Sequence, residues 1–391
     1  MSPSPLHLAV ALDGTGWHPA SWREPDARPT DLLDAGYWTS LVREAERGLL
    51  DLVTLEDTFG LQSSRPFEPD DRTDQVRGRL EAVLLAARLG PVTEHIGIMP
   101  TAITTHTEPF HLSKAIATLD YVSSGRAGVR VRVSARPDEA ALLGRRTLDR
   151  GDAPALFDEA ADWVEVVRRL WDSWEDDAEI RDAATGRFVD RHKLHYIDFE
   201  GPAFSVRGPS ITPRPPQGQP LVAALAHRDH AYRLVGRSAD LGFVTPHETA
   251  DIAGILAEIR GAQEEAGRAD EPLPVLGDVV VFLDESAEAA RDRKGRLDSR
   301  LSRHAGHREL ISDAVILTGT PSELADLVQA WQEAGLAGAR LRPGAVDHDL
   351  PQITRALVPE LQRRGAFRTA YTADTLRGHF GLGRPANRYA A

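Results

Sequence analysis

The sequence predicts an α/β fold, a parallel (β/α)8 TIM barrel with insertions. Eight short apolar runs recur along the 391 residues, and most are followed by a stretch with apolar residues at helical spacing. Such alternation favours a parallel sheet, and eight repeats favour a closed barrel over an open doubly wound sheet. A barrel needs about 250 residues, so insertions account for the remainder. Because no Pro/Gly/Ser-rich linker divides the chain, we expect residues 1–391 to form a single domain.

The first four strand–helix units occupy the N-terminal part of the chain. Gly48 and Gly90 are stop signals for the first two helices, and Pro109 can start the third. The predicted strands are Leu6–Leu12, Leu52–Glu56, His95–Thr101 and Ala127–Val133. The predicted helices are Tyr37–Gly48, Val76–Leu89, Pro109–Val122 and Asp152–Trp174.

The remaining units follow a polar, proline-rich stretch. We interpret that stretch, at about residues 175–219, as an irregular insertion and not as a domain. The next predicted strands are Leu221–Leu225, Leu241–Val244, Val275–Leu283 and Gly338–Leu341. The predicted helices are Asp229–Gly236, Ile252–Ala266, Ala287–Leu310, Pro321–Gly335 (with Thr320 as its N-cap) and Leu350–Gly365.

Composition excludes several function classes. The chain has no cysteine, which removes disulfides, thiolate metal sites, iron–sulfur clusters and cysteine nucleophiles. Its net charge of −13 makes nucleic acid and anionic membrane surfaces poor partners. The N-terminus has no basic leader, and no apolar run reaches the roughly 18 residues of a spanning helix. We therefore expect a cytoplasmic protein.

Familiar catalytic motifs are missing. Gly14-Thr15-Gly16 lacks the third glycine and the following helix of a dinucleotide fold, and the P-loop, GxSxG and HExxH patterns do not occur. Closely spaced histidines could ligate zinc together with a carboxylate, although a surface position is favoured and no metal site is expected. These pairs are His192/His195, His227/His230 and His304/His307.

Polar and aromatic residues follow the predicted strands, where the loops of a barrel converge on its mouth. They are Trp17, His18 and Trp22 after the first strand, Asp57 and Phe59 after the second, Thr101 and His106 around the end of the third, Ser134 after the fourth, and His227 and Arg228 after the fifth. Hydroxyls and aromatics with few paired carboxylates suit a large planar cofactor better than glycoside hydrolysis. The alternatives are that Asp57 caps a helix, that the threonines satisfy their own backbone, and that the tryptophans cap the core.

Several segments together resemble a known family. They include Leu55-Glu56-Asp57, Ser124-Gly125-Arg126-Ala127-Gly128, and Val358-Pro359-Glu360-Leu361-Gln362-Arg363-Arg364-Gly365. In this order, and over essentially the whole chain, the sequence resembles the luciferase-like flavin-dependent monooxygenases, in the branch of the nitrilotriacetate and dibenzothiophene-sulfone monooxygenases.

The resemblance implies a two-component enzyme. Reduced FMN, a cosubstrate delivered by a separate NAD(P)H:flavin reductase, and O2 would oxidise a small organic substrate at a C–N, N or C–S centre. It also implies a homodimer. The positions carried over place Asp57, Thr101 and Ser134 beside the flavin. On the substrate side they place Trp17, His18, Trp22, Phe59 and His106, with His106 as the catalytic candidate.

The chain departs from the family pattern at three places. Gly128-Val129-Arg130 replaces Gly-Trp-Asn, Leu156-Phe157 replaces an Arg-Tyr pair, and Ala224-Leu225-Ala226-His227-Arg228 replaces Gln-Ala-Gly-x-Ser. The last two changes remove hydroxyls that would hold the FMN phosphate, and Phe157 and Arg228 stand in their places. Arg228, near a helix N-terminus, can replace them with one charged fork. Besides the FMN monooxygenase, a deazaflavin-dependent oxidoreductase and a non-catalytic paralogue with an altered flavin site remain open.

Overall fold

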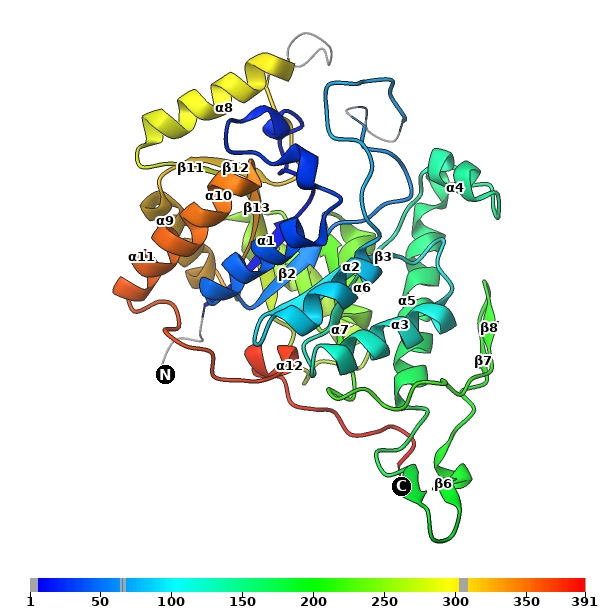
Figure 1. The fold of residues 1–391 in the computed structure, drawn as a ribbon. Helices are drawn as coiled ribbons and strands as arrows, with labels where there is room; N and C mark the ends of the chain where they lie inside the picture. Colours follow the sequence, from blue (N-terminus) through cyan, green and yellow to red (C-terminus); the bar gives the residue numbers. More distant parts are fainter. Residues whose placement is uncertain (1–5, 64, 66–67, 302–308, 391) are drawn as a thin grey trace.

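The computed structural model describes residues 6–63, 65, 68–301 and 309–390. Within these residues eight parallel strands close into a barrel in the order β1-β2-β3-β4-β9-β10-β11-β13, and β13 pairs back with β1 (Figure 1). Their bounds are β1 His7–Leu12, β2 Leu52–Leu55, β3 Gly97–Ile103, β4 Gly128–Arg132, β9 Leu221–Ala226, β10 Leu241–Val244, β11 Val275–Leu283 and β13 Gly338–Pro343. The predicted TIM barrel is therefore confirmed, strand by strand.

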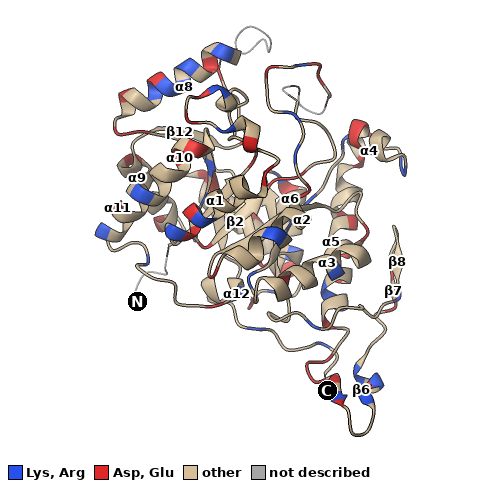
Figure 2. Ribbon diagram, in the orientation of Figure 1, with Lys and Arg blue, Asp and Glu red and all other residues tan. Residues whose placement is uncertain are grey.

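Helices surround the barrel (Figure 1). They are α1 Ala35–Arg47, α2 Ala82–Leu89, α3 Pro109–Val122, α4 Pro137–Leu143, α5 Ala153–Asp172, α6 Asp229–Ser238, α7 Asp251–Glu265, α8 Ala287–Leu301, α9 Pro321–Glu333, α10 Val346–Gln352, α11 Val358–Arg363 and α12 Leu376–His379. Thr320 caps α9 as expected, accepting from the Glu323 N–H while the Glu323 carboxylate accepts from the Thr320 N–H. Basic and acidic side chains are mixed along helices such as α8 (Figure 2).

Some predicted boundaries are wrong. The second helix starts at Ala82 and not at Val76, because Glu81 caps it and the Asp57 carboxylate accepts from the Ala82 N–H. The predicted helix Leu350–Gly365 is interrupted by a π-helical segment, Ile353–Leu357. A further strand, β12 Val315–Gly319, pairs with the second half of β11 and has no counterpart in the prediction. His304 and His307 lie outside the described residues.

The insertion at 175–219 contains two short hairpins. Strand β5 (Glu179–Asp182) pairs with β6 (Arg187–Val189), and β7 (Phe199–Glu200) pairs with β8 (Ser205–Val206). This segment extends away from the barrel (Figure 1). No helix among the described residues combines the length and apolarity needed to cross a bilayer.

The N-terminal end of the barrel interior is apolar. Side chains of a strand alternate between the interior and the surrounding helices, so every second residue points inward. The inward residues at this end form one buried cluster with the C-terminal segment: Ala9, Leu52, Met99, Leu221, Ala223, Leu241, Phe243, Leu276, Leu376, Phe380 and Leu382. Helix α12 thus closes the end of the barrel opposite to the expected active site.

Candidate active site

The C-terminal half of the barrel interior is charged. The alternation that buries Val129, Val131 and Leu341 against the helices turns Arg130 and Arg132 of β4 inward, together with two arginines of β13. The polar inward side chains at this end include Arg130, Arg132, Arg340, Arg342, Glu56, Asp278, Thr54 and Thr101. Charge replaces the apolar packing found at the other end.

Two carboxylates organise the buried arginines. Asp278, fully buried, accepts from Arg340 Nε at 2.8 Å and from Arg342 Nε at 2.8 Å. Glu56 pairs with Arg130, which also donates from Nε to Thr101 Oγ1 at 3.1 Å. Burial acts to raise the pKa of Asp278, but the two guanidinium groups outweigh it and hold that pKa below its usual value.

The arginines of this network have almost no contact with solvent. Arg130 is 3% exposed and Arg340 is 1% exposed. Burial lowers the pKa of Arg130 to about 10 although Glu56 acts in the opposite direction. The Arg340 guanidinium lies 4.4 Å from the centroid of the Phe243 ring, where the charged layer meets the apolar one. Arg342 also pairs with Asp313 at 2.7 Å.

Arg132 differs from its neighbours. It is partly buried and donates from one terminal nitrogen to the Asp57 carbonyl oxygen at 2.9 Å. No carboxylate of the described residues lies within ion-pair distance of its guanidinium, whereas Arg130, Arg340 and Arg342 each have one. Arg132 is therefore a cation at the mouth whose charge the described protein does not pair.

The three residues expected beside the flavin reach one rim of the barrel, and each has protein partners there. Asp57 accepts from the N–H groups of Thr58 and Ala82 at 2.7 and 3.0 Å. Thr101 Oγ1 donates to the Leu55 carbonyl oxygen at 2.7 Å, and Ser134 Oγ donates to Glu139 at 2.7 Å. These side chains hold the rim in place through their own hydrogen bonds.

Phe157 and Arg228 both lie near the start of α6, and the ring contact of Phe157 is with His230. Arg228 is exposed at the N-cap position of this helix, and its guanidinium has no hydrogen-bond or ion-pair partner among the described residues. The Phe157 ring lies 6.4 Å from that of His230, nearly parallel to it. The helix N-terminus and an unpaired arginine form a setting that suits an anion.

The residues expected on the substrate side make two kinds of contact: Phe59, His106 and Trp17 make ring contacts, whereas Trp22 and His18 make hydrogen bonds to the protein. Phe59 and His106 meet edge to face at 5.9 Å, and the Arg342 guanidinium lies 5.5 Å from the Trp17 ring. Trp22 donates to the Asp74 carbonyl oxygen at 3.0 Å. His18 is fully buried, with Nε2 3.2 Å from Asp298 of α8 and Nδ1 accepting from the Ala20 N–H. Both His18 nitrogens therefore have protein partners.

His106 has an unused nitrogen. Its Nε2 atom is buried and has no hydrogen-bond partner among the described residues. Burial lowers the pKa of His106, although Glu139 acts to raise it, so the ring is neutral near pH 7. A neutral imidazole nitrogen without a partner can accept or donate a proton from a bound molecule.

Sequence reasoning missed Asp278, Glu139, Arg340 and Arg342. Glu139 is fully buried and accepts from Ser134 and Thr58 at the rim. A signal existed for the arginines, because "GVRVR" and "GARLRP" place charges at every second position inside strands. Such a pattern puts the charges on one face of a strand, here the interior of the barrel.

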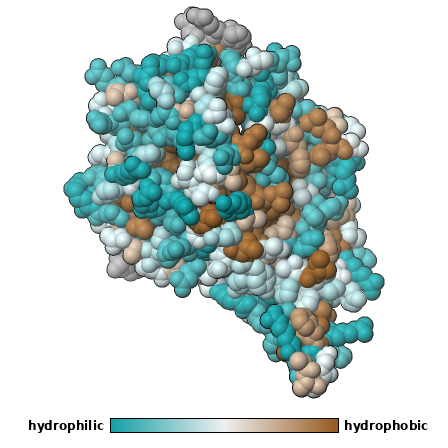
Figure 3. Space-filling view, viewed as in Figure 1, coloured by the Kyte–Doolittle hydropathy of each residue, from teal (hydrophilic) through white to brown (hydrophobic). Residues whose placement is uncertain are grey.

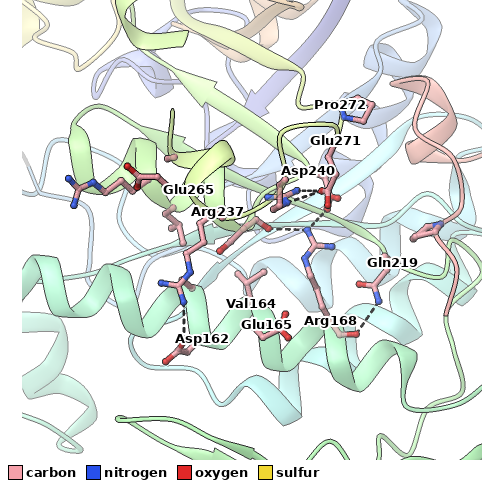
Figure 4. Close-up of a pocket in the computed structure, with 18 of the residues that line it drawn as sticks. Asp162, Val164, Glu165, Arg168, Gln219, Arg237, Asp240, Glu265, Glu271 and Pro272 are labelled. Carbon is pink, nitrogen blue, oxygen red and sulfur yellow. Dashed lines mark hydrogen bonds and ion pairs between the residues drawn. The ribbon is translucent and has the colours of Figure 1, made fainter. Parts of the chain in front are cut away.

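One cavity lies close to these residues, and a larger one lies outside the barrel. One of about 180 Å³ is bordered by Asp13, Glu56, Arg79 and apolar residues of α1 and α2. A much larger one, about 1160 Å³, is a groove between α5, α6 and the C-terminal segment on the outside of the barrel (Figure 4). Its charges are largely paired, as in Arg168–Asp240 at 2.7 Å and Arg237–Asp162 at 3.5 Å. Phe157 and His230 lie on its border.

The residues at the mouth fit a flavin. Three groups there lack an expected protein partner among the described residues: the His106 Nε2 atom, the Arg132 charge and the Arg228 guanidinium. Two are cations, and one is a neutral hydrogen-bonding group beside an aromatic ring. A planar cofactor with an anionic phosphate and ring polar atoms satisfies such a donor set.

Comparisons with known proteins indicate one family. A family model described as luciferase-like monooxygenase matches residues 17–338. Nitrilotriacetate monooxygenase component A of Aminobacter aminovorans is 32% identical, over 98% of each chain. Dibenzothiophene-sulfone monooxygenase of Rhodococcus erythropolis is 28% identical, over 93% of each chain.

Solved structures share the fold. A long-chain alkane monooxygenase superposes with a TM-score of 0.84 at 23% identity, over 97% of this chain and 96% of that one. EDTA monooxygenase from Chelativorans sp. BNC1 gives a TM-score of 0.79 at 24% identity, over 97% of this chain and 99% of that one. The chain belongs to the luciferase-like monooxygenase family and is an enzyme of the flavin-dependent oxidoreductase class.

Proposed function

We propose that this chain is the oxygenase component of a two-component monooxygenase. It would use reduced FMN from a separate NAD(P)H:flavin reductase, and O2, to oxidise a small organic substrate at a C–N, N or C–S centre. The observation that carries the proposal is the full-length similarity to a protein named component A of nitrilotriacetate monooxygenase. A protein so named works with a second component, which fits a cofactor that arrives already reduced.

Within this proposal the mouth residues have distinct tasks. Arg228 and the start of α6, beside Phe157, bind the phosphate. Asp57, Thr101 and Ser134 form the rim beside the ring through their existing hydrogen bonds. Activation of O2 is the chemistry that reduced flavin supplies when bound, and the protein orients it and excludes water.

His106 is the proposed catalytic residue. Its buried Nε2 atom has no hydrogen-bond partner among the described residues, and the ring meets Phe59, so His106 can hold or move a proton on a substrate bound there. Trp17, Trp22 and His18 support the same side of the mouth. His18 is fully buried and supports this side through its contacts with Asp298 and the Ala20 N–H.

We further propose that the working form is a cytoplasmic homodimer built from single-domain subunits. Hydrophobic residues gather where α2 and α3 face the viewer (Figure 3). Leu84 of α2 is 74% exposed, and Tyr121 and Val122 at the end of α3 are 45% and 41% exposed. Burying such a patch between two copies removes apolar surface from water. Sedimentation of wild type and Leu84→Gln tests this proposal.

The decisive experiment is a cofactor titration of the purified protein. Oxidised FMN, anaerobically reduced FMN and the deazaflavin are added separately, and binding is followed by absorbance and fluorescence. We expect reduced FMN to bind, and turnover to require a flavin reductase with NAD(P)H and O2. Binding of the deazaflavin alone would instead indicate hydride transfer without oxygen.

The hydrogen bonds at the rim are a reason to consider a third outcome of the titration, in which no cofactor binds. The Thr101 and Ser134 hydroxyls and the Asp57 carboxylate already have protein partners. A non-catalytic paralogue with an altered flavin site is compatible with that arrangement. Failure of the protein to bind any of the three cofactors would contradict the monooxygenase proposal and favour the paralogue.

A further inference from the structure

We propose that Arg132 makes the site selective for the reduced flavin over the oxidised flavin. The inference rests on the proposed function, because it needs a flavin at the mouth. It goes beyond that function in one respect: Arg132 would determine which redox state of the flavin binds. The three observations behind it are the position of Arg132 on β4, its unpaired charge and its partial exposure.

Position along β4 separates Arg132 from its inward neighbours. Arg130, two residues before it, is 3% exposed and pairs with Glu56. Ser134, two residues after it, is 2% exposed and donates to Glu139. Arg132 lies between them, partly buried, with one hydrogen bond to the Asp57 carbonyl oxygen. Its guanidinium therefore has donors left for a molecule that enters the mouth.

Arg132 differs from the arginines around it because it makes no close ion pair. Five other arginines inside the barrel or close to Arg132 have a carboxylate within ion-pair distance: Arg79 with Asp13, Arg130 with Glu56, Arg136 with Asp138, Arg340 with Asp278, and Arg342 with Asp278 and Asp313. No carboxylate of the described residues lies within that distance of the Arg132 guanidinium, whose one hydrogen bond is to a backbone carbonyl oxygen. An unpaired charge in a partly dry site is costly, and an anionic ligand reduces that cost.

The two redox states of flavin differ in the relevant charge. The ring of oxidised flavin is neutral, whereas reduced flavin loses its N1 proton near neutral pH and carries a negative charge shared with the neighbouring carbonyl oxygen. The phosphate is the same in both states. A guanidinium fork can donate to two adjacent acceptor atoms, and charge close to N1 is a recognised way in which proteins tune flavins.

The test compares the two redox states in one variant. We measure the dissociation constants of oxidised and of anaerobically reduced FMN for wild type and Arg132→Gln, at pH 8. Loss of a charge-assisted bond is expected to weaken reduced FMN roughly 10- to 100-fold. Oxidised FMN should change less than about twofold. A tenfold selective loss also lowers the midpoint potential of bound FMN by about 30 mV, which is an independent readout.

Two variants serve as controls. Arg136→Gln removes a rim arginine that already pairs with Asp138, so neither redox state should respond. Arg228→Ala should weaken both states alike, because its proposed partner is the phosphate. Circular dichroism checks that all three variants are folded, and Arg132→Lys should restore part of the selectivity.

The outcomes separate this inference from the proposed function. Equal weakening of both redox states by Arg132→Gln, or no change in either, would overturn the role of Arg132 while flavin binding by the wild type stands. Wild-type protein that binds neither state of FMN would overturn the proposed function itself. Selective loss of the reduced state, together with the fall in potential, supports the inference.

Discussion

The two ends of one barrel are built from different chemistry. At the N-terminal end, Leu376 and Phe380 of the C-terminal segment enter an apolar interior beside Met99 and Leu221. At the C-terminal end, arginines and carboxylates occupy equivalent inward positions, and Asp278 binds two of the arginines. The same strands contribute to both ends, since Gly128 of β4 lies beneath Arg130 and Arg132. Strand β4 thus changes from small to charged inward residues along its length.

This difference between the two ends indicates that the apolar end stabilises the fold and that the charged end binds a ligand. Burial of apolar surface contributes roughly 25 cal/mol per Å², so the apolar end stabilises the fold directly. Buried ion pairs seldom do so, because desolvation offsets their attraction, and apolar replacements of similar volume are often as stable. Among the inward side chains, charge gathers at the C-terminal end, which favours a ligand at that end.

The largest effect should follow from Asp278→Ala. The change leaves Arg340 and Arg342 buried, and Arg340 without a carboxylate partner except Glu56 at 3.5 Å. Breaking such a network typically costs about 3–5 kcal/mol of unfolding free energy. Urea denaturation measures it. Asp326→Ala, which removes an exposed partner of Arg364, is the control and should stay within about 0.5 kcal/mol. A cost below about 1 kcal/mol for Asp278→Ala would show that the arginines are not held by Asp278.

The next effect tests the apolar end. Leu376 is fully buried, and its side chain occupies the space where a Cβ on Gly97 or Gly128 would lie. Leu376→Ala should cost about 3 kcal/mol in the same urea assay, from lost transfer energy and the remaining cavity. FMN affinity should not change, because the flavin is expected at the opposite end. A large loss of FMN affinity at unchanged stability would contradict the division between the two ends.

A smaller effect is expected at the rim. Arg228→Ala should raise the dissociation constant of FMN roughly 10- to 100-fold, as removal of a charge-assisted bond does. Stability should stay within about 0.5 kcal/mol, because Arg228 is exposed and without a partner among the described residues. Isothermal titration with FMN and with riboflavin checks the cause. Riboflavin has no phosphate, so an equal loss with riboflavin would exclude a phosphate contact.

Sequence patterns predicted the barrel fold of this protein better than the contacts in its candidate active site. Apolar runs located all eight barrel strands, because every barrel strand must bury both faces. Helix α12 has only four residues, too few for a helical period to be recognised. Asp57 followed a strand as expected, yet its hydrogen bond to the Ala82 N–H depends on how the loop at 68–81 leads into α2.

The ion pairs of the mouth could not be predicted at all. Asp278 is 62 positions from Arg340 in the sequence, and the two meet only because β11 and β13 pair in one register, with Asp278 beside Arg340. Register depends on closure of the whole barrel and leaves no local signal. The alternating arginines indicated a charged interior, but their partners required the structure.

The smallest effect compares two histidines, one near each end. His106 Nε2 at the mouth and His379 Nδ1 in α12 are both buried without a hydrogen-bond partner among the described residues, and burial lowers both pKa values below 6.5. The stability that each neutral ring contributes is present above about pH 6.5 and is lost as the pH falls through the lowered pKa. Lowering the pH should therefore reduce the contribution of both histidines to the free energy of unfolding. Only His106 should respond to a ligand, because His379 is fixed by its Nε2 bond to the His95 carbonyl oxygen. NMR titration of the two imidazoles, assigned with His106→Gln and His379→Gln, measures their pKa values with and without FMN. A ligand-dependent shift at His379, or none at His106, would contradict the assignment of chemistry to the charged end.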